Sequence, residues 1–208
     1  MSIKKRATRK VVRRAASFWI VSALVLAACD SQPSATPITP SRPLLVVNPS
    51  DGTLFKAKGI DLFKSNDGGQ SWETLASPSG AGQSGMAALA INPDDPQMMF
   101  AAGVGWGVIR STDGGQTWQT TNTGLPDTLE VTALALHSFR RETLYAWLKG
   151  DGIYRTEDSG ANWKRMPDQG PPDKEVRGLA HSTLPGSMNT GWLYASTATG
   201  AYLSMDCF

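Results

Sequence analysis

The sequence predicts an all-β protein assembled from repeated four-stranded sheets. An eight-residue stretch occurs three times, as SNDGGQSW (65–72), STDGGQTW (111–118) and, more loosely, TEDSGANW (156–163). The copies begin 46 and 45 residues apart, and a fixed period of this size is typical of repeat architectures. The 21 glycines and 7 tryptophans suit many short strands joined by tight turns. Four short antiparallel strands per repeat of this length are typical of a β-propeller blade.

The second repeat shows how each unit is divided into strands. We expect strands at Met86–Ile91, Met98–Ala102, Gly107–Ser111 and Thr117–Thr121. Each segment is short, is rich in β-forming residues and is bounded by Gly, Pro or Asp. The stretch NPDDP between the first two segments has strong turn chemistry. The chain lacks the 3.6-residue periodicity of amphipathic helices, which excludes a helical solenoid.

The repeated stretch lies between the third and fourth expected strands, where the chain must reverse. Its aspartate can accept backbone N–H groups two residues on, and its hydroxyl can add a further hydrogen bond. Its glycine supplies a positive φ, and its tryptophan fills space beside a neighbouring strand. These positions are Ser65, Asp67, Gly69 and Trp72; Ser111, Asp113, Gly115 and Trp118; and Thr156, Asp158, Gly160 and Trp163. A fourth copy starts with Ser204 and Asp206.

This pattern resembles the Asp box, also called the BNR repeat, written S-x-D-x-G-x-x-W. The first two copies match it fully, and the third has threonine in place of serine. The resemblance covers 44–208 and implies blades at about 44–78, 85–122, 130–167 and 175–208. It also implies that the box is structural and lies at the outer edge of the blade. The boxes lack the alternating carboxylates and final glutamate of a calcium loop, so no metal or cofactor is expected.

The repeat count does not make a closed propeller, which typically has 4–8 blades. The fourth copy has Phe208 at the glycine position, and the sequence ends before a tryptophan. Two explanations remain open. The chain is an interrupted part of a longer protein, or it associates with a second copy through its open blade edges.

The N-terminus predicts export and anchoring. Seven basic residues fall in the first fourteen positions, and an apolar stretch of fourteen residues follows at 15–28. That stretch is shorter than the ~20 residues of a membrane span and is typical of a secretory signal. It runs into LAAC, which resembles the lipobox of bacterial lipoproteins. The resemblance implies a signal peptide at 1–28, acylation of Cys29, and a lipid-anchored, extracytoplasmic location in the bacterial cell envelope.

The remainder of the chain is consistent with a tethered acidic domain. Residues 29–43 are rich in Pro, Ser and Thr, so they are expected to form a tether. Beyond the basic N-terminus, thirteen basic residues remain against eighteen acidic ones, which argues against a nucleic-acid partner. If Cys29 is acylated, Cys207 has no partner for an intrachain disulfide.

The families that share this repeat include sialidases, family 74 glycoside hydrolases, sortilin-like receptors and a photosystem II assembly factor, and fold alone does not choose among them. Glycosidases generally need a pair of carboxyl groups across the scissile bond. Trp106, set between glycines, is a candidate contact for a sugar or a protein partner, or a locally packed side chain. The favoured hypothesis is a non-catalytic binding or assembly module. The alternative is the N-terminal fragment of a secreted glycoside hydrolase, xyloglucanase-like or exo-sialidase-like, with most catalytic residues missing from this chain.

Overall fold

The computed structural model describes residues 43–77, 84–167, 170–172, 175–184 and 191–204. All of them belong to one compact unit, Thr39–Phe208. The signal peptide, Cys29, most of the tether and Asp206 lie outside the described residues, so those predictions stay predictions. Within the described ranges, no helix has the length and apolarity needed to cross a membrane.

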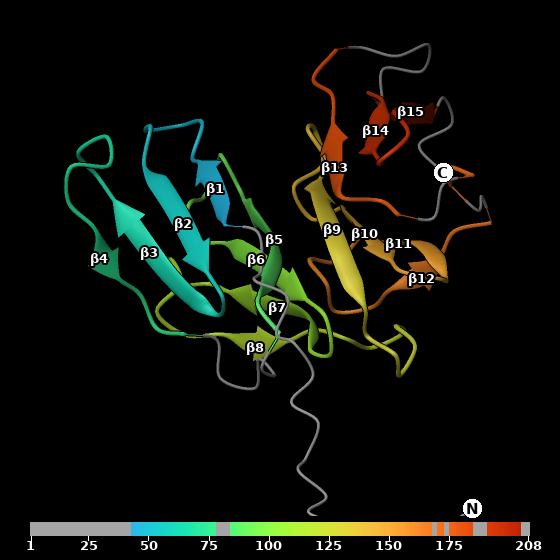
Figure 1. Cartoon of the computed structure of the whole chain (residues 1–208), viewed down its shortest axis with the longest axis horizontal. Helices are drawn as coiled ribbons and strands as arrows, with labels where there is room; N and C mark the ends of the chain where they lie inside the picture. The colour runs from blue at the N-terminus through green and yellow to red at the C-terminus, as the bar shows by residue number, and fades with distance from the viewer. Residues whose placement is uncertain (1–42, 78–83, 168–169, 173–174, 185–190, 205–208) are drawn as a thin grey trace, which may run out of the picture. The chain divides into compact units, whose positions relative to one another are not determined.

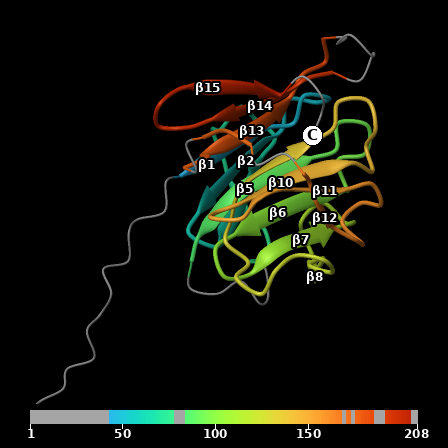
Figure 2. The same cartoon turned by 90° about the vertical axis from the view of Figure 1, so that its right-hand side faces the viewer.

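The described residues form fifteen strands in four separate antiparallel sheets, which we call blades 1 to 4 in chain order (Figure 1). Within each sheet the strands lie side by side in the order of the chain. Figure 2 shows the same sheets from the side. The predicted all-β, incomplete propeller is therefore confirmed. Blade 1 comprises β1 (Leu44–Val47), β2 (Leu54–Lys58), β3 (Asp61–Ser65) and β4 (Glu73–Thr74); blade 2, β5 (Met86–Ile91), β6 (Met99–Gly103), β7 (Gly107–Ser111) and β8 (Gln119–Thr120); blade 3, β9 (Val131–Leu136), β10 (Leu144–Leu148), β11 (Gly152–Thr156) and β12 (Lys164–Arg165); and blade 4, β13 (Gly178–His181), β14 (Leu193–Ser196) and β15 (Ala201–Ser204).

Each blade has two faces, because paired residues on neighbouring strands point to the same side of a sheet. In blade 1, face A carries Leu45, Val47, Leu54, Lys56 and Phe63, and face B carries Val46, Phe55, Ala57 and Leu62. The same register places Leu89, Ile91, Met99, Ala101 and Ile109 on face A of blade 2; Leu134, Leu136, Leu144, Ala146 and Tyr154 on face A of blade 3; and Leu179, His181, Leu193, Ala195 and Tyr202 on face A of blade 4.

The core consists of three junctions of the same kind, in which face B of one blade packs on face A of the next. Each junction is a cluster of buried side chains with an aromatic residue of β2, β6 or β10 on one side and an alanine of the following blade on the other. The pairs are Phe55 with Ala101, Phe100 with Ala146, and Tyr145 with Ala195. Small residues on face A leave room for the large residues of face B, which accounts for the close packing of successive blades.

The box forms a hydrogen-bonded turn between the last two strands of blades 1, 2 and 3. In blade 2 the Ser111 hydroxyl donates to Asp113 (2.7 Å) and accepts the N–H of Gly115 (2.8 Å). The Asp113 carboxylate accepts the N–H groups of Gln116 (3.0 Å) and Thr117 (2.8 Å). The aspartate therefore reaches three and four residues on, rather than the two residues predicted. The bond across two residues is instead made by the Asp113 N–H to the serine hydroxyl (3.3 Å).

The other two boxes repeat this turn. Their hydroxyls are Ser65 and Thr156, which bond to Asp67 (2.7 Å) and Asp158 (2.6 Å). Bonds donated by the hydroxyl and then the N–H of Thr117 hold the pKa of Asp113 down to about 2. The positive φ predicted for Gly69, Gly115 and Gly160 is present, at 91°, 89° and 89°. In blade 4, Ser204 is buried at the end of β15.

The third box contains a strained residue that the other two avoid. Ser159 has a φ of 56°, whereas the first two boxes have glycine at this place, Gly68 and Gly114, with φ of 71° and 72°. A side chain in the left-handed region costs about 1 kcal/mol or more. We therefore expect Ser159→Gly to raise the unfolding free energy by about 1 kcal/mol.

Urea unfolding followed by circular dichroism measures this difference. Ala161→Gly is the control, because Ala161 is an exposed residue of the same turn and is not among the positive-φ residues. It should lower stability by about 0.5–1 kcal/mol, since added glycine freedom then brings no relief of strain. Equal losses in both variants would contradict the strain at Ser159.

Candidate binding groove along the inner strands

The first strand of every blade contributes to one groove of about 420 Å³. Each of these strands, β1, β5, β9 and β13, is the terminal strand of its sheet. Ten of the eleven lining residues are apolar and the eleventh is a histidine: Val46, Val47, Leu89, Ala90, Ile91, Leu134, Ala135, Leu136, Leu179, Ala180 and His181. A concave surface of this size and chemistry suits an apolar ligand segment.

Two histidines meet beside this groove, although they are 44 positions apart in the sequence. The rings of His137 and His181 stack with their centroids 4.0 Å apart. Tyr145 lies parallel to His181, at 5.9 Å. His137 is 3% exposed, and it follows β9 of blade 3, whereas His181 ends β13 of blade 4. The cluster therefore joins two blades.

Backbone donors fix the neutral form of both rings. Nδ1 of His137 accepts the N–H groups of Phe139 and Arg140, each at 3.1 Å. Nδ1 of His181 accepts the N–H of Ser138 at 3.1 Å, and the Ser138 hydroxyl donates to the carbonyl of His181 at 2.8 Å. Since each Nδ1 is an acceptor, each neutral ring carries its proton on Nε2. Nε2 of His181 is buried and has no partner among the described residues.

Both rings resist protonation. Burial, followed by repulsion from His181 in its protonated form and from the positive charges of Arg140, Arg141 and Arg155, lowers the pKa of His137 to about 4. Burial also lowers the pKa of His181. Protonation of either ring at Nδ1 would replace an acceptor by a donor that faces an N–H group. The junction of blades 3 and 4 is therefore built for the neutral rings.

His137 also occupies a repeat position that was not recognised in the sequence. The residue directly after each inner strand uses its side chain to accept the N–H two residues on. In the other blades this residue is Asn48, Asn92 or Ser182. The sequence signal was the alignment of VNPS and INPD with LHSF and HSTL. Histidine satisfies the same turn and adds a ring that reaches the next blade.

Trp106 does not lie in the groove. It is 3% exposed and belongs to the buried cluster between blades 1 and 2. Its Nε1 donates to the carbonyl of Ser84 at 3.2 Å, and a β-carbon on Gly103 would lie 2.3 Å from its ring. The ring is therefore a packing element in this structure. Its burial argues against the predicted contact with a ligand and favours the locally packed alternative.

The box residues contribute to packing rather than to the groove. Trp118 and Trp163 are buried, and Trp163 donates from Nε1 to the carbonyl of Thr121 in the preceding blade at 2.7 Å. Trp72 is partly exposed, with the ammonium of Lys56 4.0 Å from its ring centroid. Arg110 donates to the carbonyl of Ser159 at 3.2 Å, so it also serves the blade structure. Among the described residues, no three His, Cys, Asp or Glu side chains are grouped to hold a metal ion.

A second hollow, of about 370 Å³, lies between β4 and the box turn of blade 2. Its lining is mostly polar and includes Lys64, Glu73, Gln97 and Asp113. The Asp113 carboxylate is already bonded within its own turn. The inner-strand groove is the better candidate because all four blades contribute to it and most of its lining residues are apolar, with both apolar and polar atoms exposed in it.

The repeated antiparallel sheets and the groove on their inner strands define this chain as a β-propeller-type repeat protein. Solved structures of propellers match it. One is the GH74 xyloglucanase from Xanthomonas campestris, with a TM-score of 0.61 and 18% identity over 78% of this chain. Another is YCF48 bound to D1 peptide, with a TM-score of 0.52 and 19% identity over 78%. The Malassezia sympodialis allergen Mala s 1 matches with a TM-score of 0.53 and 14% identity over 74%.

These likenesses show the fold alone, because sequence identities of 14–19% are too low to show a shared function. The chain spans 28% of the length of the xyloglucanase, 48% of YCF48 and 51% of the allergen. No family model matches the sequence. No curated protein matches it either.

Proposed function

We propose that this protein is a non-catalytic binding or assembly module that holds an apolar segment of a protein partner in its inner-strand groove. The observation that carries the proposal is the lining of that groove, ten apolar residues and one histidine. Burying apolar surface of a ligand there supplies affinity at about 25 cal/mol per Å². Among the described strands, the terminal position of each inner strand also leaves one of its edges without a neighbour in its sheet. Such an edge suits recognition of a peptide backbone. YCF48, which shares the fold, is described as bound to a peptide.

A peptide-binding assay tests the proposal. The probes are fluorescein-labelled ten-residue peptides in which leucine alternates with serine, compared with peptides of serine and glycine alone. Fluorescence anisotropy with the full chain should show binding of the leucine peptides. Leu136→Lys, which places a charge in the groove lining, should weaken that binding at least tenfold. Leu184→Lys is the control, since Leu184 is 66% exposed and is not part of the lining.

The competing function is glycoside hydrolysis, and the same protein tests it. The likeness to a GH74 xyloglucanase favours xyloglucan as the substrate, and sialyl-lactose tests the sialidase version. Release of reducing sugar or sialic acid by the purified full chain would favour the hydrolase. Leucine-peptide affinity that is unchanged in Leu136→Lys, or no peptide binding, would contradict the proposed groove.

We further propose that the module is anchored to a membrane through Cys29. The support is the sequence LAAC after a basic and apolar leader, followed by the tether at 29–43. Cys29→Ser should abolish incorporation of labelled palmitate in a bacterial host and shift the protein from the membrane to the soluble fraction. Cys207→Ser is the matched control and should change neither result. Unchanged labelling of Cys29→Ser would contradict the anchor.

A further inference from the structure

Two blade faces lack the cover that the other six faces have among the described residues. On face A of blade 1, Leu45 is 62% exposed and Val47 is 53% exposed. Their equivalents on blade 2, Leu89 and Ile91, are 8% and 7% exposed, because face B of blade 1 covers them. The exposed leucine and valine therefore belong to a surface that is built as one half of a blade junction.

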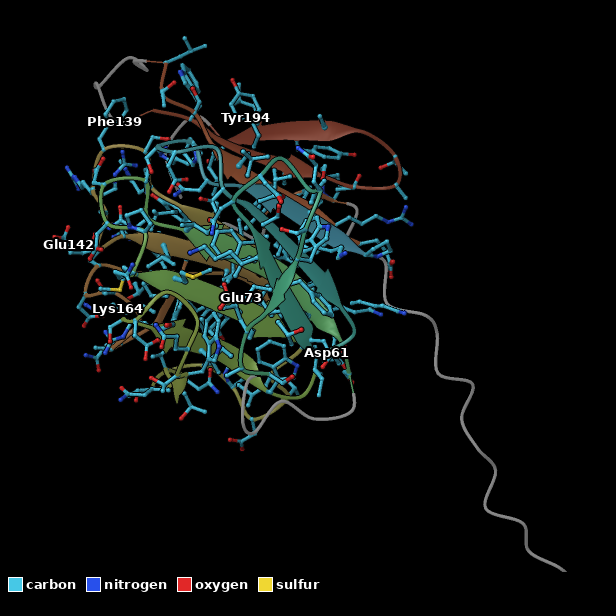
Figure 3. All side chains as sticks on the ribbon, turned by 90° about the vertical axis from the view of Figure 1, so that its left-hand side faces the viewer. Asp61, Glu73, Phe139, Glu142, Lys164 and Tyr194 are labelled. Carbon is cyan, nitrogen blue, oxygen red and sulfur yellow. The ribbon has the colours of Figure 1, made fainter. Side chains whose placement is uncertain are left out.

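Blade 4, at the other end of the row of blades, exposes the complementary half of a blade junction. On face B of blade 4, Tyr194 is 38% exposed and Leu203 is 47% exposed. Tyr194 takes the place of Phe55, Phe100 and Tyr145 in the repeat. Those three aromatic residues are at most 3% exposed, because each packs on face A of the following blade. Figure 3 labels Tyr194 at the surface.

One residue distinguishes the exposed face A from the three covered ones. Lys56 stands where blades 2, 3 and 4 have Ala101, Ala146 and Ala195. Its ammonium lies over the rings of Trp72 and Phe63, with centroid distances of 4.0 and 5.2 Å. In a junction of the usual kind this position meets the aromatic residue of face B. A lysine at this position can contact a tyrosine ring by a cation–π interaction. However, the larger lysine occupies the space that alanine leaves for the aromatic residue of face B in the other junctions. A junction at this face is therefore expected to be weaker than the three within the chain.

We propose that face B of blade 4 in one copy of this chain docks on face A of blade 1 in a second copy, and the reverse. This contact continues the junction that the chain already makes three times with equivalent residues. Two copies supply eight blades, within the range of about 4–8 seen in closed propellers, and the reciprocal contact closes the pair with two-fold symmetry. In this proposal the exposed faces make the contact, whereas association through the blade edges stays an untested prediction.

The experiment is sedimentation equilibrium of the full chain in density-matched detergent, with Leu45→Asp and Tyr194→Asp measured alone and mixed. The native chain should form dimers. Either variant alone should be monomeric, because every junction would contain one charged face. The equimolar mixture should recover dimers through one junction, from the intact blade 4 of the first variant and the intact blade 1 of the second. That recovery also shows that both variants are folded.

Phe139→Asp is the control, because Phe139 is 52% exposed but lies in the loop after β9, outside both faces (Figure 3). It should leave the dimer unchanged. Lys56→Ala should tighten the dimer, since it restores the alanine of the other junctions. A monomeric native chain would overturn the proposal and leave the faces to further blades or another partner. Dimers that persist in Leu45→Asp, as an anchor or another surface would give, or a mixture that stays monomeric, would overturn it as well. Neither Leu45 nor Tyr194 lines the groove, so the two proposals fail separately.

Discussion

Trp147→Ala is expected to lower the free energy of unfolding by about 3–5 kcal/mol. The side chain is fully buried, at 0% exposure, on face B of blade 3. It belongs to the cluster that joins blade 3 to Leu193 and Val176 of the next repeat. Gly170 lies so close that a β-carbon there would be 2.5 Å from the ring. Truncation therefore removes a large apolar surface and leaves a cavity that a tightly packed site cannot readily fill.

Trp147→Phe separates the loss of volume from the loss of the indole N–H. Nε1 of Trp147 is buried and finds no acceptor among the described residues. Phenylalanine removes that unsatisfied donor, which partly offsets the smaller cavity, so the loss should stay below about 2 kcal/mol. Urea unfolding of the full chain, followed by circular dichroism, measures both variants. Equal losses of stability in Trp147→Phe and Trp147→Ala would contradict this explanation. They would show either that the indole N–H has an acceptor or that the volume of the side chain does not determine the loss.

Acidification from pH 7 to 4.5 is expected to destabilise the junction of blades 3 and 4. The pKa of His137 is about 4 in the folded protein and 6.5 as its ordinary value. As the pH falls below 6.5, the unfolded chain binds a proton that the folded chain does not, so stability is lost until the pH approaches 4. The loss that this ring contributes over the window is about 2–3 kcal/mol. The lowered pKa of His181 adds a loss of the same sign.

His137→Asn is the matched variant, since blades 1 and 2 have Asn48 and Asn92 at this position with the same turn. The asparagine can accept the backbone N–H but does not titrate, so the fall in stability between pH 7 and 4.5 should be smaller in the variant. The box carboxylates have little effect on this comparison. The pKa values of Asp113 and Asp158 lie below 3.8, so both groups stay ionised between pH 7 and 4.5. Urea unfolding at both pH values measures the difference. An equal fall in the native chain and the variant would refute a role for His137.

Local sequence patterns were sufficient for the blade, the places of its box turns and part of its strand bounds. Two predicted strands, Met86–Ile91 and Gly107–Ser111, have the predicted bounds. The fourth strand of blade 2 was expected at Thr117–Thr121 but comprises Gln119–Thr120. It is shortened because the box turn, through Asp113, holds the N–H of Thr117. These features are determined by residue patterns within one repeat, so they can be predicted from a single sequence.

Features that depend on contacts between repeats were harder to predict. Trp106 follows a glycine-rich stretch that is typical of an exposed loop, yet it is buried because blade 1 supplies the surface it packs against. The two histidines are far apart in the sequence, and the repeat brings their rings to 4.0 Å. The groove was not predicted because its lining is distributed over four strands of different blades. Aligning the last residue of each inner strand and the residue after it shows that His181 ends its strand and that His137 directly follows the preceding one.

The tryptophan of the third box is hydrogen-bonded to the repeat that precedes it in the chain. Trp163 donates from its N–H to the carbonyl of Thr123 at 2.8 Å and from Nε1 to that of Thr121. When coupling is limited to neighbours, the stability of the array is the sum of its blades and its junctions. A blade at either end is held by one junction and opens more easily than a blade held by two. Closing two copies into a ring would give every blade two neighbours, so amide exchange from β1 and β14 would slow as the protein concentration rises.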